Sequence, residues 1–420
     1  MDNTRFSAEI FLSRNRTIVA VFAAVHFLFL MLLLPDITAG RVYGDVDLYR
    51  QWAFLGLREG VWQGIDVPWV YPIGAMLPML AAGIFGYNSY MFGWFLLCTL
   101  LNALALLMLK GSRRLRYGWQ AAYLWVLLIA ILGPLVFSRV DGISAPLVVV
   151  GLVLASERPA LASALLSLAT WIKVWPAAVI LALVLASKAR MQVLLAGITV
   201  SAAMIGGVLA GGGAKNLLGF IKAQGERGMQ LEAPFTTPGL WQAVLGLGTR
   251  VHANTEIVTM EIKGSLSDFV GTLMNPLLCL SLALVSLLIL AGVRRGADRR
   301  ELLVVGALAL VSAMIVFNKV GSPQFMIWLV AVTCVGVAVY GRLWVVPAVA
   351  MLVIAIFTTL VYPILYVQLY AALNPGVALL LTVRNALVLT LFCWALLKLV
   401  GIVRADSRSH HSQNGVSIRG

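Results

Sequence analysis

The stretch G-T-L-M-N-P-L-L-C-L-S-L-A-L-V-S-L-L-I-L-A-G-V, residues 271–293, decides the fold of this chain, and R-R-G-A-D-R-R follows it at 294–300. An uncharged apolar run of this length spans the roughly 30 Å hydrocarbon core of a bilayer as an α-helix. Arginines directly after such a run are typical of its cytoplasmic end. The stretch therefore predicts a transmembrane helix whose C-terminal end faces the cytoplasm.

Comparable apolar runs follow one another along the 420 residues, and they predict an all-α polytopic membrane protein with about a dozen transmembrane helices. The chain is 61% hydrophobic and 11% charged, whereas a soluble domain has roughly 25% charged residues. Lipid is therefore its main solvent. The three short runs between 143 and 187 cross only if they tilt or pack inside the bundle. The runs lie near 17–34, 88–109, 119–137, 143–156, 160–172, 174–187, 192–210, 271–293, 301–317, 324–340, 344–363 and 378–400.

Short basic clusters between the runs orient the chain. With both termini in the cytoplasm, every cluster falls on the cytoplasmic side, as the positive-inside rule requires. The first run is expected to remain as an uncleaved helix, because Pro35 and Asp36 occupy the place of a cleavage site. The clusters account for the net charge of +14, so no nucleic-acid partner is expected. Their members are Lys110, Arg113, Arg114, Arg116, Lys188, Arg190, Arg294, Arg295, Arg299, Arg300, Arg342, Lys398, Arg404 and Arg408.

The apolar segment 73–85 does not fit this alternation. It is short, and a crossing there would place the basic cluster at 110–116 outside. We interpret it as an interfacial or re-entrant helix, with a full crossing as the alternative.

Two large segments, 35–72 and 211–270, remain on the outer side. Most of the acidic residues fall on that side, so we expect any chemistry there. We expect residues 1–403 to form a single transmembrane domain and residues 404–420 to form a disordered cytoplasmic tail.

The first outer segment contains R-V-Y-G-D-V-D-L-Y-R-Q-W at 41–52. The glycine marks a break, and a helix is expected to begin at Asp45, a good N-cap residue. Helical spacing places Asp45, Tyr49 and Trp52 on one face, and it places Asp47 and Arg50 on another, where they can pair. A carboxylate beside aromatic surface can accept a proton from a sugar hydroxyl. A plain helix cap is the alternative for Asp45.

Two further outer stretches supply substrate-binding candidates. W-V-Y-P at 69–72 offers Tyr71 as a substrate wall, although aromatic residues at this depth also form the membrane-interface belt. The stretch E-R-G-M-Q-L-E-A-P at 226–234 offers Arg227, Gln230 and Glu232, with an ordinary polar loop as the alternative. Asp141, another outer acidic residue, is included with these candidates.

Basic residues at the outer ends of helices form the last group of candidates, namely Arg139, Lys173, Lys319 and Arg384. Arg384 lies within the apolar run 378–400, where a cation costs roughly 2.5–3.5 kcal/mol at the centre of a helix. We expect these cations to hold a lipid phosphate, and snorkelling to the headgroups is the alternative. Lys319 begins K-V-G-S-P-Q, which adds Ser322 and Gln324 as donors.

The sequence offers no motif for a cofactor. It lacks a phosphate-binding glycine loop and an H-E-x-x-H helix, and it has no cluster of metal ligands. The four cysteines lie singly in apolar runs, which predicts free thiols.

Five motifs, taken in order, resemble glycosyltransferase family 87, which belongs to the C-type superfamily of integral-membrane glycosyltransferases. The likeness extends from the first helix to about residue 330, and more loosely to the end. The motifs are G-D-V-D-L-Y at 44–49, W-V-Y-P at 69–72, I-K-V-W-P at 172–176, E-R-G-M-Q-L-E at 226–232 and K-V-G-S-P-Q-F-M-I-W at 319–328.

The resemblance implies a C-type fold, a helical bundle with a cavity that opens to the outer leaflet of the plasma membrane. It implies inverting transfer of a sugar, usually mannose, from a polyprenyl-phosphate donor to a glycolipid or cell-envelope glycan. The family's catalytic aspartate maps onto Asp45 with Tyr49, and Asp47 is close enough to leave the choice open. Family members that act on phosphatidylinositol mannosides carry S-P-I-S-W-x-H-H, where this chain has S-P-Q-F-M-I-W; that acceptor is therefore in doubt.

Two other functions compete with the transferase. A lipid or sugar transporter, or flippase, is the main alternative, although such proteins often show repeats with broken helices, and none is evident. A structural membrane subunit would leave the acidic outer side and Arg384 unexplained. The donor sugar is open as well, because arabinose fits the same chemistry as mannose.

Overall fold

Long helices in the computed structural model begin and end close to the apolar runs. The structure describes residues 15–112, 115–221, 227–255 and 259–416, and it describes side chains within 16–405 of these ranges. Among the residues discussed above, Arg113, Arg114 and Glu226 lie outside the described residues.

Seven helical segments within these ranges are long and apolar enough to cross a membrane. The segment Pro323–Ile364 contains two α-helices, α15 (Met326–Tyr340) and α16 (Val345–Thr359), which are joined by a short 3-10 helix, Gly341–Trp344. The predicted total of about a dozen crossings stays a prediction. The other six segments belong to α2 (Asn15–Thr38), α5 (Tyr90–Gly111), α6 (Gly118–Val136), α10 (Arg190–Ala210), α13 (Ser265–Arg294) and α18 (Pro375–Val416).

Several helices lie inside the bundle rather than against lipid. Almost every residue of α14 (Arg299–Val316) and α15 is buried, and α7 (Asp141–Leu154) is buried along its length. A helix that is apolar all round is expected in such a position. α7 is one of three short helices, with α8 (Pro159–Ile172) and α9 (Pro176–Ala186), that match the short runs predicted between 143 and 187.

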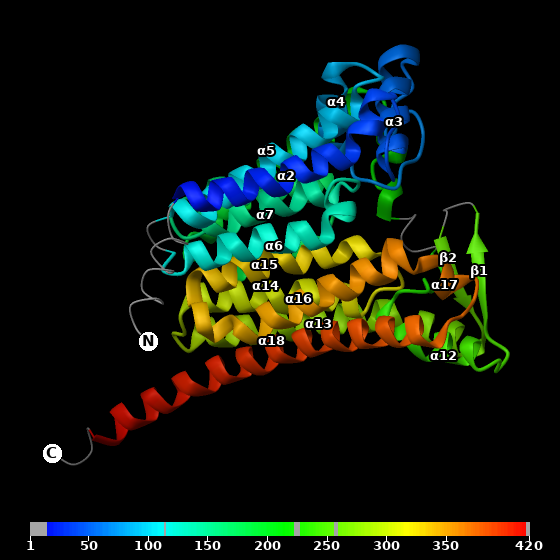
Figure 1. Ribbon diagram of the computed structural model, residues 1–420. Helices are drawn as coiled ribbons and strands as arrows, with labels where there is room; N and C mark the ends of the chain where they lie inside the picture. The colour runs from blue at the N-terminus through cyan, green and yellow to red at the C-terminus, as the bar shows by residue number, and fades with distance from the viewer. Residues whose placement is uncertain (1–14, 113–114, 222–226, 256–258, 417–420) are drawn as a thin grey trace, which may run out of the picture.

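The segments 35–72 and 211–270, which the sequence predicts to be on the outer side, build one end of the bundle (Figure 1). The first supplies α3 (Val46–Glu59), and the second supplies α12 (Thr237–Val244) and a β-hairpin. α4 (Met76–Ala82) and α17 (Tyr366–Tyr370) lie toward the same end (Figure 1). Segment Ile73–Phe85, which contains α4, is one of the shorter apolar helices; its interfacial or re-entrant position stays a prediction.

The hairpin corrects the prediction of an all-α chain. Strand β1 (Arg250–Asn254) pairs antiparallel with β2 (Thr259–Lys263), and Val251 lies opposite Ile262 in the register. The apolar residues of both strands alternate with polar ones, which is the pattern of a half-buried strand.

The C-terminal helix leaves the bundle. α18 is helical as far as Val416, and its end extends beyond the other helices (Figure 1). An isolated helix is marginal without packing. The prediction that residues 404–420 are disordered in solution therefore stays a prediction.

Candidate active site

The chain enters α3 through Gly44, whose φ of 63° is left-handed. A Cβ at this position would approach the Cβ of Ser138 to 2.9 Å, so the backbone packs closely against the junction between α6 and α7. Asp45 occupies the N-cap position of α3, but its side chain makes no capping hydrogen bond. Its Oδ2 instead forms an ion pair with Nη1 of Arg139, from that junction. The carboxylate of Asp45 is therefore directed toward a cation rather than used as a plain cap.

Asp47 has different partners. Nη2 of Arg50 donates to its Oδ1 at 2.7 Å, which is the pair that helical spacing predicts, and Nε2 of Gln51 donates to its Oδ2 at 2.9 Å. Arg50 also donates to the carbonyl of Gly40 and stacks over the ring of Tyr87 at 4.2 Å. Asp47 thus helps to fasten α3 to its surrounding loops.

A series of polar and aromatic contacts runs from Asp45 to a second carboxyl group. Nη2 of Arg139 donates to the hydroxyl of Tyr362 at 3.1 Å. The ring of Tyr362 lies 5.2 Å from that of Tyr366, whose hydroxyl donates to Oε2 of Glu232 at 3.4 Å. We call these five residues the Asp45–Glu232 network.

Arg384 borders this network from α18. It is 2% exposed, and its guanidinium donates to the backbone carbonyl of Glu232 and to Oδ1 of Asn385. Nδ2 of Asn385 in turn donates to Oγ1 of Thr237 at 3.0 Å. Arg384 therefore faces polar partners inside the protein and does not snorkel to the headgroups.

The carboxyl of Glu232 is buried between cations. The residue is 6% exposed, and burial raises the pKa of its carboxyl to about 7. Arg384, the hydroxyl of Tyr366 and Arg139 oppose that shift. At neutral pH the group is therefore present in both its protonated and its ionised form.

A second cluster begins two residues after Arg139. Asp141 is 1% exposed; its Oδ1 accepts from Nε1 of Trp328 at 2.6 Å, and its Oδ2 lies 3.8 Å from Nζ of Lys173. Nζ of Lys173 also lies 4.6 Å from the ring centre of Tyr71. The hydroxyl of Tyr71 is 3.5 Å from that of Tyr49, which lies buried on α3. The predicted residues Tyr49, Tyr71, Asp141 and Lys173 thus meet in one place, the Asp141 cluster.

A third contact joins the stretch after residue 226 to the loop before α15. The backbone N–H of Gln230 donates to the carbonyl of Lys319 at 2.9 Å, and Oε1 of Gln230 accepts from the N–H of Gly321 and the hydroxyl of Ser322. A Cβ on Gly321 would collide with the backbone of Ala233. Lys319 therefore contributes its carbonyl here. Gln324 lies buried in the turn that follows, Pro323–Phe325.

A family model of known proteins covers much of this site. The model of glycosyltransferase family 87 matches residues 69–317, which is more than half of the chain. The chain belongs to glycosyltransferase family 87. No curated protein and no solved structure matches it.

The family 87 protein is accordingly a glycosyltransferase, and its long apolar helices indicate a membrane protein. The matched range contains seven of the candidate residues, namely Tyr71, Arg139, Asp141, Lys173, Arg227, Gln230 and Glu232. The candidates on α3 and at its N-cap, which include Asp45, lie before it, and Lys319, Ser322, Gln324 and Arg384 lie after it.

Glu261 was absent from the candidates, although it joins the hairpin of the family 87 protein to the stretch that contains Gln230. Its buried carboxylate accepts from Nζ of Lys263 at 2.9 Å and from Nδ2 of Asn254 at 3.1 Å. Burial alone would raise the pKa of Glu261, but these hydrogen bonds outweigh it and the net pKa is lowered. The backbone of Glu261 also forms an isolated antiparallel β-bridge with the backbone of Gln230. Arg227 lies near Glu261 and Tyr71, and burial lowers its pKa.

Tyr362, Tyr366 and Trp328 were missed as well. The first two lie near the break between α16 and α17, where aromatic residues alone indicate only a membrane interface. Trp328 ends the motif at 319–328, and nothing in the local sequence indicates that its indole donates to Asp141, which is distant in the chain.

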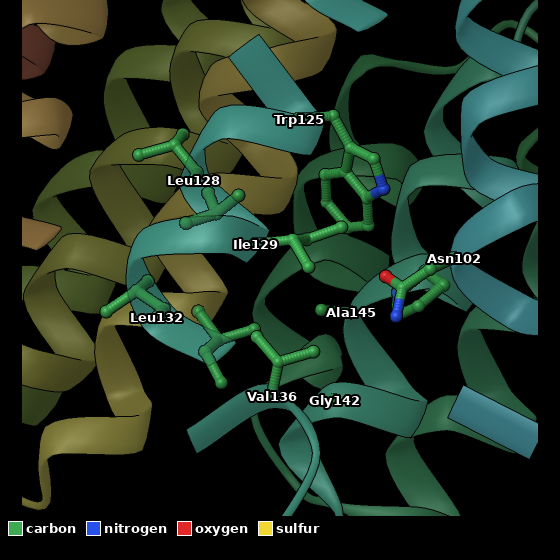
Figure 2. Close-up of a pocket in the computed structure, with 11 residues that line it drawn as sticks. Asn102, Trp125, Leu128, Ile129, Leu132, Val136, Gly142 and Ala145 are labelled. Carbon is green, nitrogen blue, oxygen red and sulfur yellow. The ribbon is translucent and has the colours of Figure 1, made fainter. Parts of the chain in front are cut away.

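Figure 2 shows a small cavity elsewhere in the bundle, between α5, α6, α7 and α15. Its volume is about 10 Å³, room for about one water molecule, and its lining includes Asn102, Trp125 and Ile129. A sugar does not fit there. Among the described residues, no group of three or more His, Cys, Asp or Glu side chains is placed to hold a metal ion.

Proposed function

We propose that this family 87 protein is an inverting glycosyltransferase of the C-type fold in the plasma membrane. It moves a sugar, mannose rather than arabinose, from a polyprenyl-phosphate donor to a lipid-linked or cell-envelope glycan acceptor. The reaction takes place on the outer face, and both termini are cytoplasmic. The donor's polyprenyl tail lies in the membrane lipid.

The observation that supports this proposal most is the contact between Asp45 and Arg139 at the end of the bundle where the outer segments gather. A base must reach the acceptor hydroxyl, and a cation must neutralise the leaving phosphate. Arg139 and Asp45 bring both groups to one place. Arg384 adds a second cation beside the same network.

The reaction is a single in-line displacement. Asp45 takes the proton of the acceptor hydroxyl as its oxygen attacks the anomeric carbon opposite the phosphate. Arg139 and Arg384 hold the phosphate through charge-assisted hydrogen bonds. Asp47 is the weaker candidate for the base, because both of its oxygens already accept hydrogen bonds from Arg50 and Gln51.

The other candidate residues surround this centre. Tyr49, Tyr71 and Lys173 provide aromatic surface and a cation near Asp141, which suits a sugar ring and its hydroxyls. Gln230 and Ser322, which contact each other, provide amide and hydroxyl groups. Arg227, Lys319 and Gln324 complete the expected binding surface.

Transfer of label tests the proposal. Purified protein in liposomes is supplied with radiolabelled polyprenyl-phosphate mannose and a panel of glycolipid acceptors. We expect label to appear in a new glycolipid with inverted anomeric configuration, and we expect Asp45→Asn to abolish this product. Transbilayer movement of the donor without a product would support the transporter and would overturn the proposal. Label transferred from the arabinose donor alone would correct the sugar.

A further inference from the structure

The Asp45–Glu232 network ends in a carboxyl group for which the reaction above has no role. Asp45 and Glu232 lie at opposite ends of a path through Arg139, Tyr362 and Tyr366. One carboxylate is partly exposed at 28%, whereas the other residue is buried. Two carboxyl groups in such unequal surroundings are the usual arrangement of a base and an acid in one active site.

The hydrogen bonds of Arg384 leave the Glu232 carboxyl available. The guanidinium donates to the backbone carbonyl of Glu232 and to Asn385, and no hydrogen bond from it to the Glu232 carboxylate exists in the described part of the chain. The hydroxyl of Tyr366, at 3.4 Å, is the carboxyl's hydrogen-bond partner. Arg384 therefore attracts the Glu232 carboxylate through charge, and no hydrogen bond from its guanidinium occupies the carboxyl oxygens.

We propose that Glu232 is the proton donor to the departing phosphate, and this inference rests on the function proposed above. Glu232 lies between Arg139 and Arg384, the two cations assigned to that phosphate. The departing phosphate, which both arginines attract, receives the proton from Glu232 as negative charge develops on its oxygen.

The proton and electron balance of the step is complete. A bond forms between the acceptor oxygen and the anomeric carbon, and the acceptor's proton passes to Asp45. The bond between the anomeric carbon and the phosphate oxygen breaks, and its electron pair remains on that oxygen. Glu232 gives its proton to this oxygen, so the products are the glycoside and polyprenyl phosphate. Asp45 then releases a proton to water and Glu232 takes one up, which resets the enzyme.

The charged and titratable groups that face Glu232 support this role. They are Arg384 from α18, Tyr366 from α17 and Arg139 from the α6–α7 junction. With a pKa of about 7, the carboxyl is a suitable donor near neutral pH, because a general acid works best when its pKa lies close to the working pH. The second pKa of a phosphate monoester is about 6, so the transfer is nearly balanced.

The test compares Glu232→Gln with the wild-type protein in donor binding and in turnover against pH. Glutamine is a neutral analogue of protonated glutamate, so we expect donor affinity at pH 6 to stay within about threefold. We expect turnover to fall by about 100-fold, the lower range for a general acid. Wild-type kcat/KM is expected to fall tenfold per pH unit above about 7, and this limb is expected to disappear in the variant.

Two further variants complete the test. Glu232→Asp keeps an acid and is expected to regain part of the turnover and the alkaline limb. Glu59→Gln alters an exposed carboxylate at the end of α3 and serves as the matched control, with turnover within twofold of wild type. If Glu232→Gln fails to fold, as judged by size-exclusion chromatography, Glu232→Asp decides through its pH profile alone.

Half of wild-type turnover in Glu232→Gln, or an unchanged alkaline limb, would overturn the inference while the proposed function stands. A large change in donor affinity at pH 6 would also overturn it, because it would indicate a structural counter-ion. Absence of transfer by the wild-type protein would instead refute the proposed function.

Discussion

The Asp45–Glu232 network and the Asp141 cluster lie on the two sides of one short junction, yet they differ in what they leave open. Arg139 and Asp141 are separated by a single residue. In the first region the carboxylate of Asp45 is 28% exposed and joins loops from distant parts of the chain. In the second region Asp141 is 1% exposed and is enclosed by Trp328 and Lys173. Asp45, which reaches solvent, can exchange its partner for a substrate, whereas the enclosed Asp141 holds Trp328 and Lys173 in place.

The largest effect is expected when the base of the first region, Asp45, is removed. Asp45→Asn keeps the size of the side chain and loses its ability to take a proton, so we expect turnover to fall by about 10²–10⁴-fold. The free energy of unfolding is expected to change by less than about 1 kcal/mol, because the ion pair is partly exposed. Label transfer measures turnover, and thermal unfolding of the same preparation measures stability. A variant that keeps more than about a tenth of wild-type turnover would move the base elsewhere.

The next effect concerns the second region and is one of stability. Asp141→Asn leaves the cation of Lys173 without its partner, and breaking a buried pair costs about 3–5 kcal/mol. We expect a lower Tm in detergent, with Glu59→Gln as the unaffected control. An unchanged Tm, with turnover lost as in Asp45→Asn, would show that Asp141 belongs to the chemistry rather than to the scaffold.

A smaller effect tests how the first region is placed. Gly44→Ala puts a side chain at a φ of 63° and against Ser138. The left-handed backbone costs roughly 1–2 kcal/mol, so we expect a modest fall in Tm and a shift of Asp45 away from Arg139 that lowers turnover. Gly60→Ala, at the C-cap of α3 with a φ of 71° and open space around it, is the control for backbone strain alone. Equal loss of turnover in both variants would remove the special role of the Gly44 contact.

The smallest effect is expected at Asp47. The carboxylate of Asp47 is 45% exposed in its pair with Arg50, and pairs that water screens contribute about 0–1 kcal/mol. We expect Asp47→Asn to keep turnover within about threefold of wild type, since a loosened α3 still presents Asp45 to Arg139. A loss that matches Asp45→Asn would exchange the roles of the two carboxylates.

Local spacing in the sequence predicted contacts between residues that lie close together in the chain. The helical repeat predicted that Asp47 pairs with Arg50, and the glycine before Asp45 was recognised as a break. Membership of family 87 agrees with the resemblance carried by the five motifs. Apolar runs likewise predicted the long helices.

Contacts between distant segments were not available to that reasoning. Arg139, in the α6–α7 junction, bonds Tyr362, which lies between α16 and α17, and Arg384 in α18 bonds the carbonyl of Glu232. Each of these bonds joins segments that are far apart in the sequence. The carbonyl of Lys319 accepts from the N–H of Gln230, a contact that the sequence did not predict, and the role of its ammonium stays a prediction. The hairpin and Glu261 were overlooked because a short alternating pattern was outweighed by the helical composition of the whole chain.

A structure with donor and acceptor bound would test the central claim most directly. Our account predicts an oxygen of Asp45 within about 2.6–3.2 Å of the acceptor hydroxyl, with the donor phosphate in contact with Arg139. A bound sugar whose anomeric carbon faces Asp47, or a phosphate held away from Arg139, would contradict it.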